Sequence, residues 1–281
     1  MPDVSKPFKA ACVQMRSGLD RARNTADAVA SIEKAAGEGA MFIATPEMTN
    51  VVDRKGGRLL SALPTEDALE EINTFSEAAK RLGVWLLIGS VAVKQGERAA
   101  NRGLLFAPDG VVVSRYDKLH MFDVDLPGGE SWNESKIYEP GREAFVVNTP
   151  FAKLGLSICY DLRFPKLYRE MAQAGANVLC VPAAFTRQTG EAHWKTLLRA
   201  RAIENGAFVV APAQGGTHED GRETYGHSLI IGPWGEILAE ADHDEPGIIV
   251  ADIDPAASSE ARQRIPNLAL EQNLKISIIN Q

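Results

Sequence analysis

The sequence predicts an α/β protein in which mixed β-sheets carry helices on their outer faces. Short apolar runs alternate with segments whose apolar residues recur at helical spacing, which is the pattern of strands and amphipathic helices. Two hairpin signals, at 108–110 and 233–235, interrupt this alternation, so antiparallel strands must join the parallel ones. No linker or low-complexity stretch divides the 281 residues, and we expect a single domain over 1–281.

The first half of the chain supplies two predicted helices. One begins at the cap residue Asn24 and ends at Gly37, and an amphipathic one covers 69–82 and stops at Gly83. The polar stretch 118–142 is predicted to be a loop, and a loop of this length is usually functional or disordered. Apolar runs predict strands at 8–15, 41–45, 84–93, 103–107 and 111–116.

The second half repeats this organisation. Apolar residues at helical spacing predict a helix over about 191–204. From residue 254 the chain turns polar, so we expect 254–281 to form an arm rather than part of the core. Strands are predicted at 145–148, 154–158, 177–181, 208–211, 228–231, 237–240 and 248–253.

Composition excludes several classes of function. The formal net charge is −7 and the pI about 5.4, so neither nucleic acid nor an anionic membrane is an expected partner. Three cysteines without a C-x-x-C pair argue against a disulfide framework or zinc site, and Cys12 and Cys180 lie in apolar runs that should be core. No spacing such as H-E-x-x-H occurs, so we expect no metal and no cofactor. The N-terminal residues lack an apolar signal region, which favours the cytoplasm.

The stretch G-L-S-I-C-Y-D-L-R-F-P at 155–165 places Cys159 between an apolar strand and a helix. We expect Asp161 to cap that helix, Pro165 to lie in its first turn and Gly175 to close it. Such a turn raises the thiol above the sheet and leaves backbone N–H groups free, and a helix N-terminus or a cation lowers a thiol pKa. The sequence thus suggests a nucleophile, although a cysteine ending an apolar strand is often only a small buried hydrophobe.

Three ionisable side chains follow apolar strands: Glu47, Lys118 and Cys159. Ligands of α/β sheets bind where strands deliver their carboxyl ends, so the three side chains meet if their strands are neighbours. Glu47 would then take the thiol proton and Cys159 would attack an electrophilic carbon. Lys118 would stabilise the oxyanion beside the N–H of Tyr160. The alternative is that Glu47 and Lys118 form an ordinary ion pair in loops.

The motifs around these residues, taken together, resemble the nitrilase superfamily of carbon–nitrogen hydrolases. The resemblance implies a four-layer α-β-β-α sandwich with two mixed central sheets and a Glu–Lys–Cys triad at Glu47, Lys118 and Cys159. It also implies a second glutamate at Glu134, which positions water or helps to protonate the leaving amine. The matching segments are P-E at 46–47, Y-D-K-L-H-M-F-D at 116–123, the stretch 155–165, W-N-E-S-K-I-Y-E-P-G at 132–141, G-E-A-H-W-K-T-L-L-R-A-R-A-I-E-N at 190–205, Y-G-H-S-L-I-I-G-P-W-G at 225–235 and R-Q-R-I-P at 262–266.

The resemblance carries an expectation about assembly. Members of the family associate through the helix that follows the cysteine, so this chain is expected to form a homodimer or a higher homo-oligomer. Leu167, Tyr168 and Met171 would then belong to the interface rather than the core, and the arm 254–281 would contribute dimer contacts.

Within the family, the chain most resembles the deaminated glutathione amidases and the ω-amidases, and D-V-D-L-P-G at 123–128 and A-Q-G-G-T-H at 213–218 favour the former. Both groups hydrolyse amides of anionic, dicarboxylate-type substrates, which suits Arg163 and Arg187 as carboxylate ligands. Alternatively, Arg163 pairs with Asp161 or Glu170, and Arg187 is merely exposed. The remaining expected substrate contacts are Tyr160, Phe185, Thr186, Trp132 and His193, of which Trp132 could simply pack and His193 could be a core residue.

The expected activity is thiol-dependent hydrolysis of a small amide, with release of ammonia or an amine through a Cys159 thioester. An ω-amidase, a true nitrilase and an N-carbamoyl amino acid hydrolase use the same residues and stay open alternatives. A catalytically silent dimeric binding module would lack one member of the triad, and none is missing here.

Overall fold

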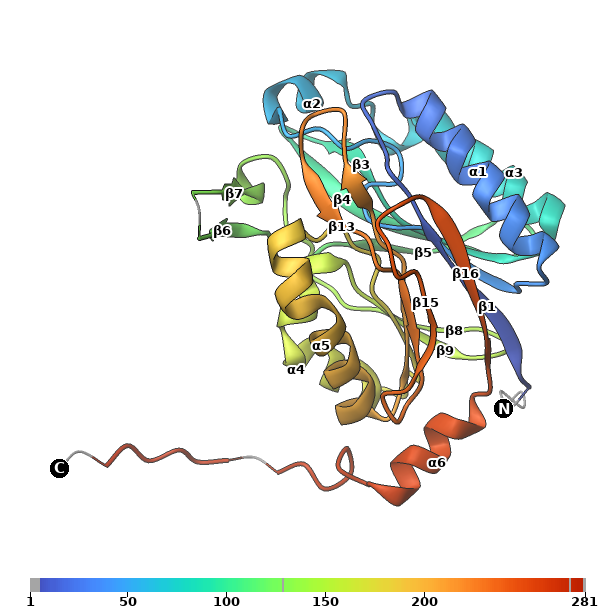
Figure 1. Cartoon of the computed structure of the whole chain (residues 1–281), viewed down its shortest axis with the longest axis vertical. Helices are drawn as coiled ribbons and strands as arrows, with labels where there is room; N and C mark the ends of the chain where they lie inside the picture. Colours follow the sequence, from blue (N-terminus) through green and yellow to red (C-terminus); the bar gives the residue numbers. More distant parts are fainter. Residues whose placement is uncertain (1–5, 128, 273, 280–281) are drawn as a thin grey trace.

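Two six-stranded mixed sheets lie face to face in the computed structural model, which describes residues 6–127, 129–272 and 274–279 (Figure 1). In the first sheet β1, β2 and β3 run parallel, and the strands outside them are antiparallel. Its strands, in spatial order, are β16 (Gly247–Ile253), β1 (Phe8–Gln14), β2 (Phe42–Ala44), β3 (Trp85–Gln95), β4 (Arg98–Phe106) and β5 (Val112–Asp117).

The second sheet follows the same plan, with three central parallel strands, β9, β10 and β11, and antiparallel neighbours on both sides. Its strands, in spatial order, are β15 (Ile237–Glu240), β14 (Leu229–Ile231), β11 (Phe208–Ala211), β10 (Val178–Cys180), β9 (Lys153–Leu156) and β8 (Val146–Asn148).

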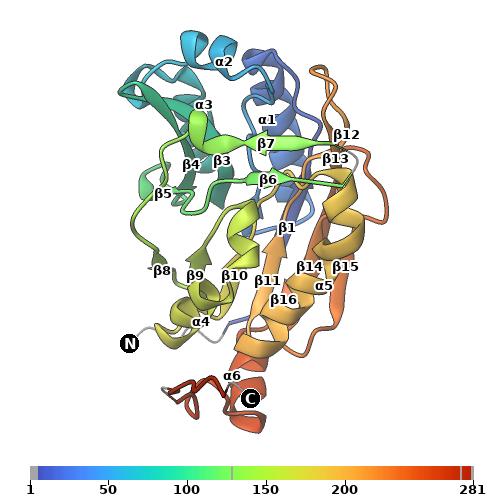
Figure 2. The same ribbon diagram turned by 90° about the vertical axis from the view of Figure 1, so that its left-hand side faces the viewer.

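Helices cover the outer face of each sheet. The helices α1 (Arg21–Gly37) and α3 (Glu70–Leu82) pack Ile32 and Phe75 against the first sheet. The helices α4 (Pro165–Gln173) and α5 (Arg187–Asn205) pack on the opposite side of the molecule against the second sheet (Figures 1 and 2). The predicted four-layer α-β-β-α sandwich with two mixed sheets is therefore confirmed.

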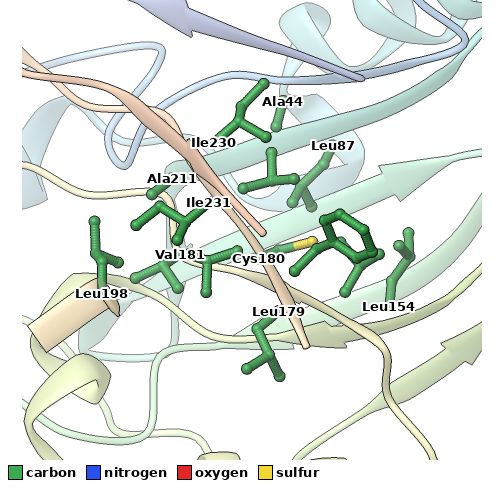
Figure 3. Close-up of a cluster of buried hydrophobic side chains, with 14 of the residues drawn as sticks. Ala44, Leu87, Leu154, Leu179, Cys180, Val181, Leu198, Ala211, Ile230 and Ile231 are labelled. Carbon is green, nitrogen blue, oxygen red and sulfur yellow. The ribbon is translucent and has the colours of Figure 1, made fainter. Parts of the chain in front are cut away.

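The space between the sheets is filled by apolar side chains from both. Ala44 and Leu87 of the first sheet meet Leu154 and Cys180 of the second (Figure 3). Because alternate residues of a strand face opposite sides, each inner strand supplies one residue in two to this core. Cys12 and Cys180 are both fully buried here, as predicted, and burial raises the pKa of each thiol far above its ordinary value.

Two predicted helix caps are wrong. The helix α1 is capped by Asp20, four residues before the predicted cap Asn24, because the carboxylate of Asp20 accepts a hydrogen bond from the backbone N–H of Arg23. Asn24 lies inside the helix, where its buried amide bonds the backbone of Gly18 and Asn50.

After Cys159 the chain first forms the 3₁₀ turn η3 (Cys159–Arg163), and α4 starts only at Pro165. The side chain of Asp161 makes no cap there, because it bonds groups near Cys159 and Lys118. Gly175 follows the end of α4 with φ of 100°, which suits the predicted stop.

Several segments are more ordered than the sequence suggests. The stretch 118–142 contains the hairpin of β6 (Asp123–Asp125) and β7 (Ser131–Asn133), which lies in front of the sheets in Figure 2. The helix α5 starts at Arg187, four residues before its predicted start, with Thr186 as its cap. Further elements are α2 (Gly56–Ala62), η1 (Glu66–Ala68), η2 (Glu134–Lys136), β12 (Gly215–Thr217) and β13 (Glu223–Tyr225).

The C-terminal region divides into two parts. The helix α6 (Ala256–Arg264) buries Ser258 and Ala261 against the chain, so this part of 254–281 is not a free arm. Beyond residue 264 the chain first contacts α5 and α4, because Asn267 donates to the carbonyl oxygen of Glu204 and Glu271 pairs with Arg169 (3.5 Å), and it then runs away from the sheets (Figure 1). No helix in the described ranges combines the length and the apolar character required to cross a bilayer.

The apolar face of α4 is not a subunit interface, contrary to the expectation from the family resemblance. Leu167, Tyr168 and Met171 are at most 7% exposed, because they pack against the second sheet of their own chain. They are core residues of a single subunit and not an interface.

Candidate active site

A cavity of about 230 Å³ lies where the carboxyl-terminal ends of strands from both sheets meet the segment after β5. Glu47 comes three residues after β2, Lys118 directly after β5, and Cys159 three residues after β9. Glu134 is brought to the same cavity by the turn η2. The structure therefore brings together the four residues for which the sequence suggested a catalytic role.

Cys159 stands on a strained turn. Its φ of 51° lies in the left-handed region, which a residue with a side chain rarely adopts and which often marks a functional site. The turn is tied to the segment after β10, because the N–H of Cys159 donates to the carbonyl oxygen of Pro182 (2.9 Å). The side chain is 7% exposed and faces the cavity.

Glu47 is held by three donors from three parts of the chain. Its Oε1 accepts hydrogen bonds from Nζ of Lys118 and Nδ2 of Asn101, both at 2.9 Å. Its Oε2 accepts the backbone N–H of Ala184 (2.9 Å). Because all three donors are fixed by the fold, the carboxylate has one orientation in the cavity.

Lys118 lies between two carboxylates. Its Nζ is 2.9 Å from Glu47 and 2.8 Å from Glu134, and the Lys118 side chain is only 2% exposed. Oε2 of Glu134 also accepts the backbone N–H of Phe122 at 2.7 Å. The arrangement holds the ammonium group of Lys118 between the two carboxylates.

These contacts determine the protonation states at rest. Burial is the largest influence on Glu47 and opposes its charge, but the Lys118 cation, the hydrogen bond from Cys159 and the charge of Arg222 together hold the pKa of Glu47 below its usual range. Burial also opposes the charge on Lys118, yet Glu134 and Glu47 raise the pKa of Lys118 well above its ordinary value. Burial and the charge of Glu47 raise the pKa of the Cys159 thiol. The expectation of a lowered thiol pKa is thus wrong, and the proton must leave Cys159 when it reacts.

Asp161 ties the cysteine turn to the strand end that carries Lys118. Its fully buried carboxylate accepts the hydroxyl of Tyr116 (2.6 Å) and the backbone N–H of Ile158 (2.8 Å). It also accepts the backbone N–H of His120 (3.1 Å) and lies 2.7 Å from Nδ1 of that ring. Tyr116 and His120 flank Lys118, so one carboxylate fixes the Cys159 turn relative to the ammonium group.

Five of the expected substrate contacts line the cavity: Tyr160, Arg163, Phe185, Thr186 and Trp132. The guanidinium of Arg163 lies 5.4 Å from the ring centre of Phe185 and 5.9 Å from that of Tyr160. Neither salt bridge considered for Arg163, with Asp161 or with Glu170, forms in the described residues. Its charge is therefore available to a ligand.

Two expected contacts lie elsewhere. Arg187 is exposed at the start of α5 and pairs with Asp244 (2.9 Å) and Glu223 (3.6 Å), so it is not placed to bind substrate. His193 is exposed on the next turns of α5, and its Nδ1 lies 3.3 Å from Arg163. It can reach the cavity only through that arginine and is not a core residue.

Sequence reasoning missed several residues of the site. Asn101 bonds Glu47 and, at 3.3 Å, Glu134, but it lies inside β4, where no motif marks it. Arg54 and Arg222 line the cavity from loops far apart in the chain. Within the described residues, no group of three or more His, Cys, Asp or Glu side chains is placed to hold a metal ion.

The chain is similar to known proteins over most of its length. The model of the carbon–nitrogen hydrolase family matches residues 9–263. The chain is 42% identical to a deaminated glutathione amidase of Synechocystis sp., over 94% of this chain and 97% of the relative. It is 34% identical to human omega-amidase NIT2, over 92% and 93% of the two chains.

A solved structure shares this fold. The NitFhit protein of C. elegans superposes with a TM-score of 0.87 at 35% identity. The match covers 95% of this chain and 66% of the longer NitFhit chain. With the family model matching most of its length, this chain belongs to the carbon–nitrogen hydrolases of the nitrilase superfamily.

Proposed function

We propose that this protein hydrolyses small anionic amides through a Cys159 thioester, in the manner of a deaminated glutathione amidase. The observation that carries the proposal is the meeting of Cys159, Glu47 and Lys118 in one cavity, with Glu134 beside them. The 42% identity to a protein of that name favours this substrate class over the other amides of the family.

The first half of the reaction uses the thiol and its base. Glu47 accepts the proton of Cys159 while the sulfur attacks the amide carbon, because a thiol with a raised pKa does not ionise in advance. The oxyanion that forms is stabilised by the fixed ammonium group of Lys118. Glu47 then gives its proton to the nitrogen, the C–N bond breaks, and the amine leaves a Cys159 thioester.

The second half restores the enzyme. Water attacks the thioester carbon and passes a proton to Glu47, and the C–S bond breaks as the acid forms. Glu47 returns that proton to the sulfur. Glu134 is placed to orient the water or to share its proton, since it bonds the same Lys118 ammonium group as Glu47.

Arg163 supports the assignment of an anionic substrate. Its guanidinium is half-buried at the cavity beside two aromatic rings, where a carboxylate can be bound bidentately. The cavity of about 230 Å³ is smaller than the roughly 300–1,000 Å³ of typical ligand pockets. A short dicarboxylic acyl group, with its free carboxylate on Arg163, suits both features.

The test asks whether Cys159 forms the thioester. Wild-type protein mixed with a five-carbon ω-amide acid should release ammonia, and mass spectrometry should find the acyl group on Cys159. Cys159→Ala should abolish turnover and leave thermal unfolding almost unchanged, whereas Cys180→Ala, which alters a buried cysteine outside the cavity, should retain it. A Cys159→Ala variant with the wild-type rate would end the proposal. If the matching nitrile or an N-carbamoyl amino acid is turned over faster than the amide, that compound class is the substrate instead.

We further propose that the chain forms a homodimer in the cytoplasm, in which the C-terminal arm, here the part of the chain beyond residue 264, packs against the second subunit. Three unpaired cysteines suit a reducing compartment. In a single subunit the arm leaves several apolar side chains 69–85% exposed. Light scattering should give twice the subunit mass for the full chain and the mass of a single subunit for a chain that ends at residue 264. A monomeric full chain would contradict the proposal. The exposed residues are Leu270, Leu274, Ile276, Ile278 and Ile279.

A further inference from the structure

We propose that Asn101 is a positioning residue, whose side-chain amide holds the carboxylates of Glu47 and Glu134 side by side. The buried cluster contains two carboxylates but only one ammonium group, that of Lys118, and the Asn101 amide supplies a second donor to both. The inference rests on the proposed function, because it concerns the base of that reaction. It also predicts a property of the Cys159 thiol that can be measured without turnover of any substrate.

One atom of Asn101 contacts both carboxylates. Its Nδ2 donates to Oε1 of Glu47 at 2.9 Å and to Oε1 of Glu134 at 3.3 Å. Nζ of Lys118 donates to the same two oxygen atoms, each at 2.9 Å. The two oxygens are therefore held against the same two nitrogen atoms, and two like charges lie close together.

The charges of this cluster do not balance. Two carboxylates face one ammonium group, so one negative charge remains in excess at a buried place where water and salt screen it little. A hydrogen bond to a carboxylate favours its ionised form, and the Asn101 amide therefore helps to keep both carboxylates charged. The other ionisable groups near the two carboxylates are the thiol of Cys159 on η3, the guanidinium of Arg222 between β12 and β13, and the hydroxyl of Tyr138 after η2.

The orientation of the amide argues against a merely structural role. Asn101 is 1% exposed, and its Oδ1 is buried without a hydrogen-bond partner in the described part of the chain. A buried acceptor without a donor is costly, so an asparagine that only supported the fold would satisfy both ends of its amide. The opposite orientation would place Oδ1 against two carboxylate oxygens. The donor end is thus kept on Glu47 and Glu134, although the acceptor end is left unsatisfied.

The strand β4 holds Asn101 in place. Its backbone pairs with Ala92 of β3, and its carbonyl oxygen accepts the backbone N–H of Lys118 at 3.0 Å. One residue therefore fixes the segment that carries the ammonium group through its backbone and fixes Glu47 through its side chain.

The first test removes the donor with Asn101→Leu, which keeps a similar side-chain volume. The ionised form of Glu47 loses a hydrogen bond, so the pKa of Glu47 should rise. Because Glu47 must be ionised to accept the thiol proton, the acidic limb of kcat/KM for an ω-amide acid should move to higher pH by about one unit. The plateau of kcat should fall about tenfold at a nearly constant KM, because the carboxylate is no longer held in one orientation.

The second test needs no substrate. Alkylation of Cys159 by iodoacetamide, followed by mass spectrometry, should show the same upward movement of the acidic limb in Asn101→Leu. In Glu134→Gln the neighbouring negative charge is gone, so adding Asn101→Leu to that variant should move the limb less than half as far. Equal movements with and without Glu134→Gln would show that Asn101 does not join the two carboxylates, and would overturn the proposal.

Asn205→Leu is the matched control. Asn205 is fully buried, and its Oδ1 also has no partner in the described residues, but it lies at the end of α5 and does not line the cavity. Its substitution should lower the midpoint of urea unfolding without moving the acidic limb or changing kcat. Asn101→Ser is a smaller change, and it should move the limb in the same direction if Asn101→Leu does not fold.

The outcomes separate this inference from the proposed function. Wild-type limbs in both Asn101 variants, or a loss of activity that is equal at every pH, would overturn the positioning role and leave the amidase intact. A protein that hydrolyses no amide but shows the shifted alkylation limb would refute the proposed function and retain the effect of Asn101 on the thiol and its base.

Discussion

Removing one hydroxyl group, by Tyr116→Phe, tests whether a buried carboxylate positions the nucleophile. Tyr116 is 1% exposed, and its hydroxyl lies 2.6 Å from Asp161, which is fully buried. A hydrogen bond to a charged group contributes roughly 1.5–3 kcal/mol, so the free energy of unfolding should fall by about 2 kcal/mol. Asp161 keeps its bonds to Ile158 and His120, and the fold should therefore survive.

Tyr168→Phe is the matched control. Tyr168 is equally buried, but its hydroxyl lies 2.7 Å from the neutral hydroxyl of Ser157 and is not part of the Asp161 network. A neutral hydrogen bond contributes about 1 kcal/mol, which is less than the loss expected at Tyr116. Urea unfolding with an unchanged m-value would report both losses.

Activity distinguishes a positioning role from simple destabilisation. Because Asp161 fixes the Cys159 turn against the segment with Lys118, Tyr116→Phe should lower kcat by about tenfold at a nearly constant KM. Tyr168→Phe should change kcat by less than about twofold. Equal losses of stability in the two variants, with kcat unchanged at Tyr116→Phe, would show that Asp161 does not act as a clamp.

Three more outcomes are expected. Glu134→Gln should lower kcat by roughly 100-fold at an unchanged melting temperature, and a wild-type pre-steady-state rate would exclude a role for Glu134. Burial lowers the pKa of His218 from 6.5 to about 4, so the unfolded chain binds this proton more strongly; His218 should account for a loss of about 3 kcal/mol of stability from pH 7 to 4, and His218→Gln should remove that part of the pH dependence. In Gly89→Ala the new Cβ would lie 2.1 Å from the carbonyl oxygen of Thr45, so urea unfolding should show a loss of several kcal/mol, and an unaffected midpoint would refute the clash.

The sequence was sufficient to anticipate the layers and the meeting of strand ends. Hydrophobic periodicity marks strands and helices, and Glu47, Lys118 and Cys159 each follow an apolar run, so parallel neighbours deliver them to one edge. Asn101 and Arg222 escaped notice because their importance depends on distant partners, namely Glu47 and Trp132. Position in the chain carries no information about such pairs.

Burial explains the remaining errors. Asp161 fits the pattern of a helix cap, and only the packed structure shows that Tyr116 and His120 surround it. Likewise, a cysteine before a helix suggests a lowered thiol pKa, but burial and the charge of Glu47 raise the pKa of Cys159 instead. Local sequence patterns identify the ionisable groups, whereas the surroundings of each group in the fold determine its protonation state before reaction.

The two sheets contribute different parts of the proposed reaction: the sheet of β2 and β5 brings the carboxylate of Glu47 and the ammonium group of Lys118, and the sheet of β9 brings the sulfur of Cys159. Any sliding of one layer over the other thus changes the distance between reacting atoms directly. Turnover should consequently fall before any spectroscopic sign of melting if the sheets slip past each other, and substitutions at Leu87 or Leu154, which lie between the sheets, should weaken turnover at temperatures where the secondary structure is still intact.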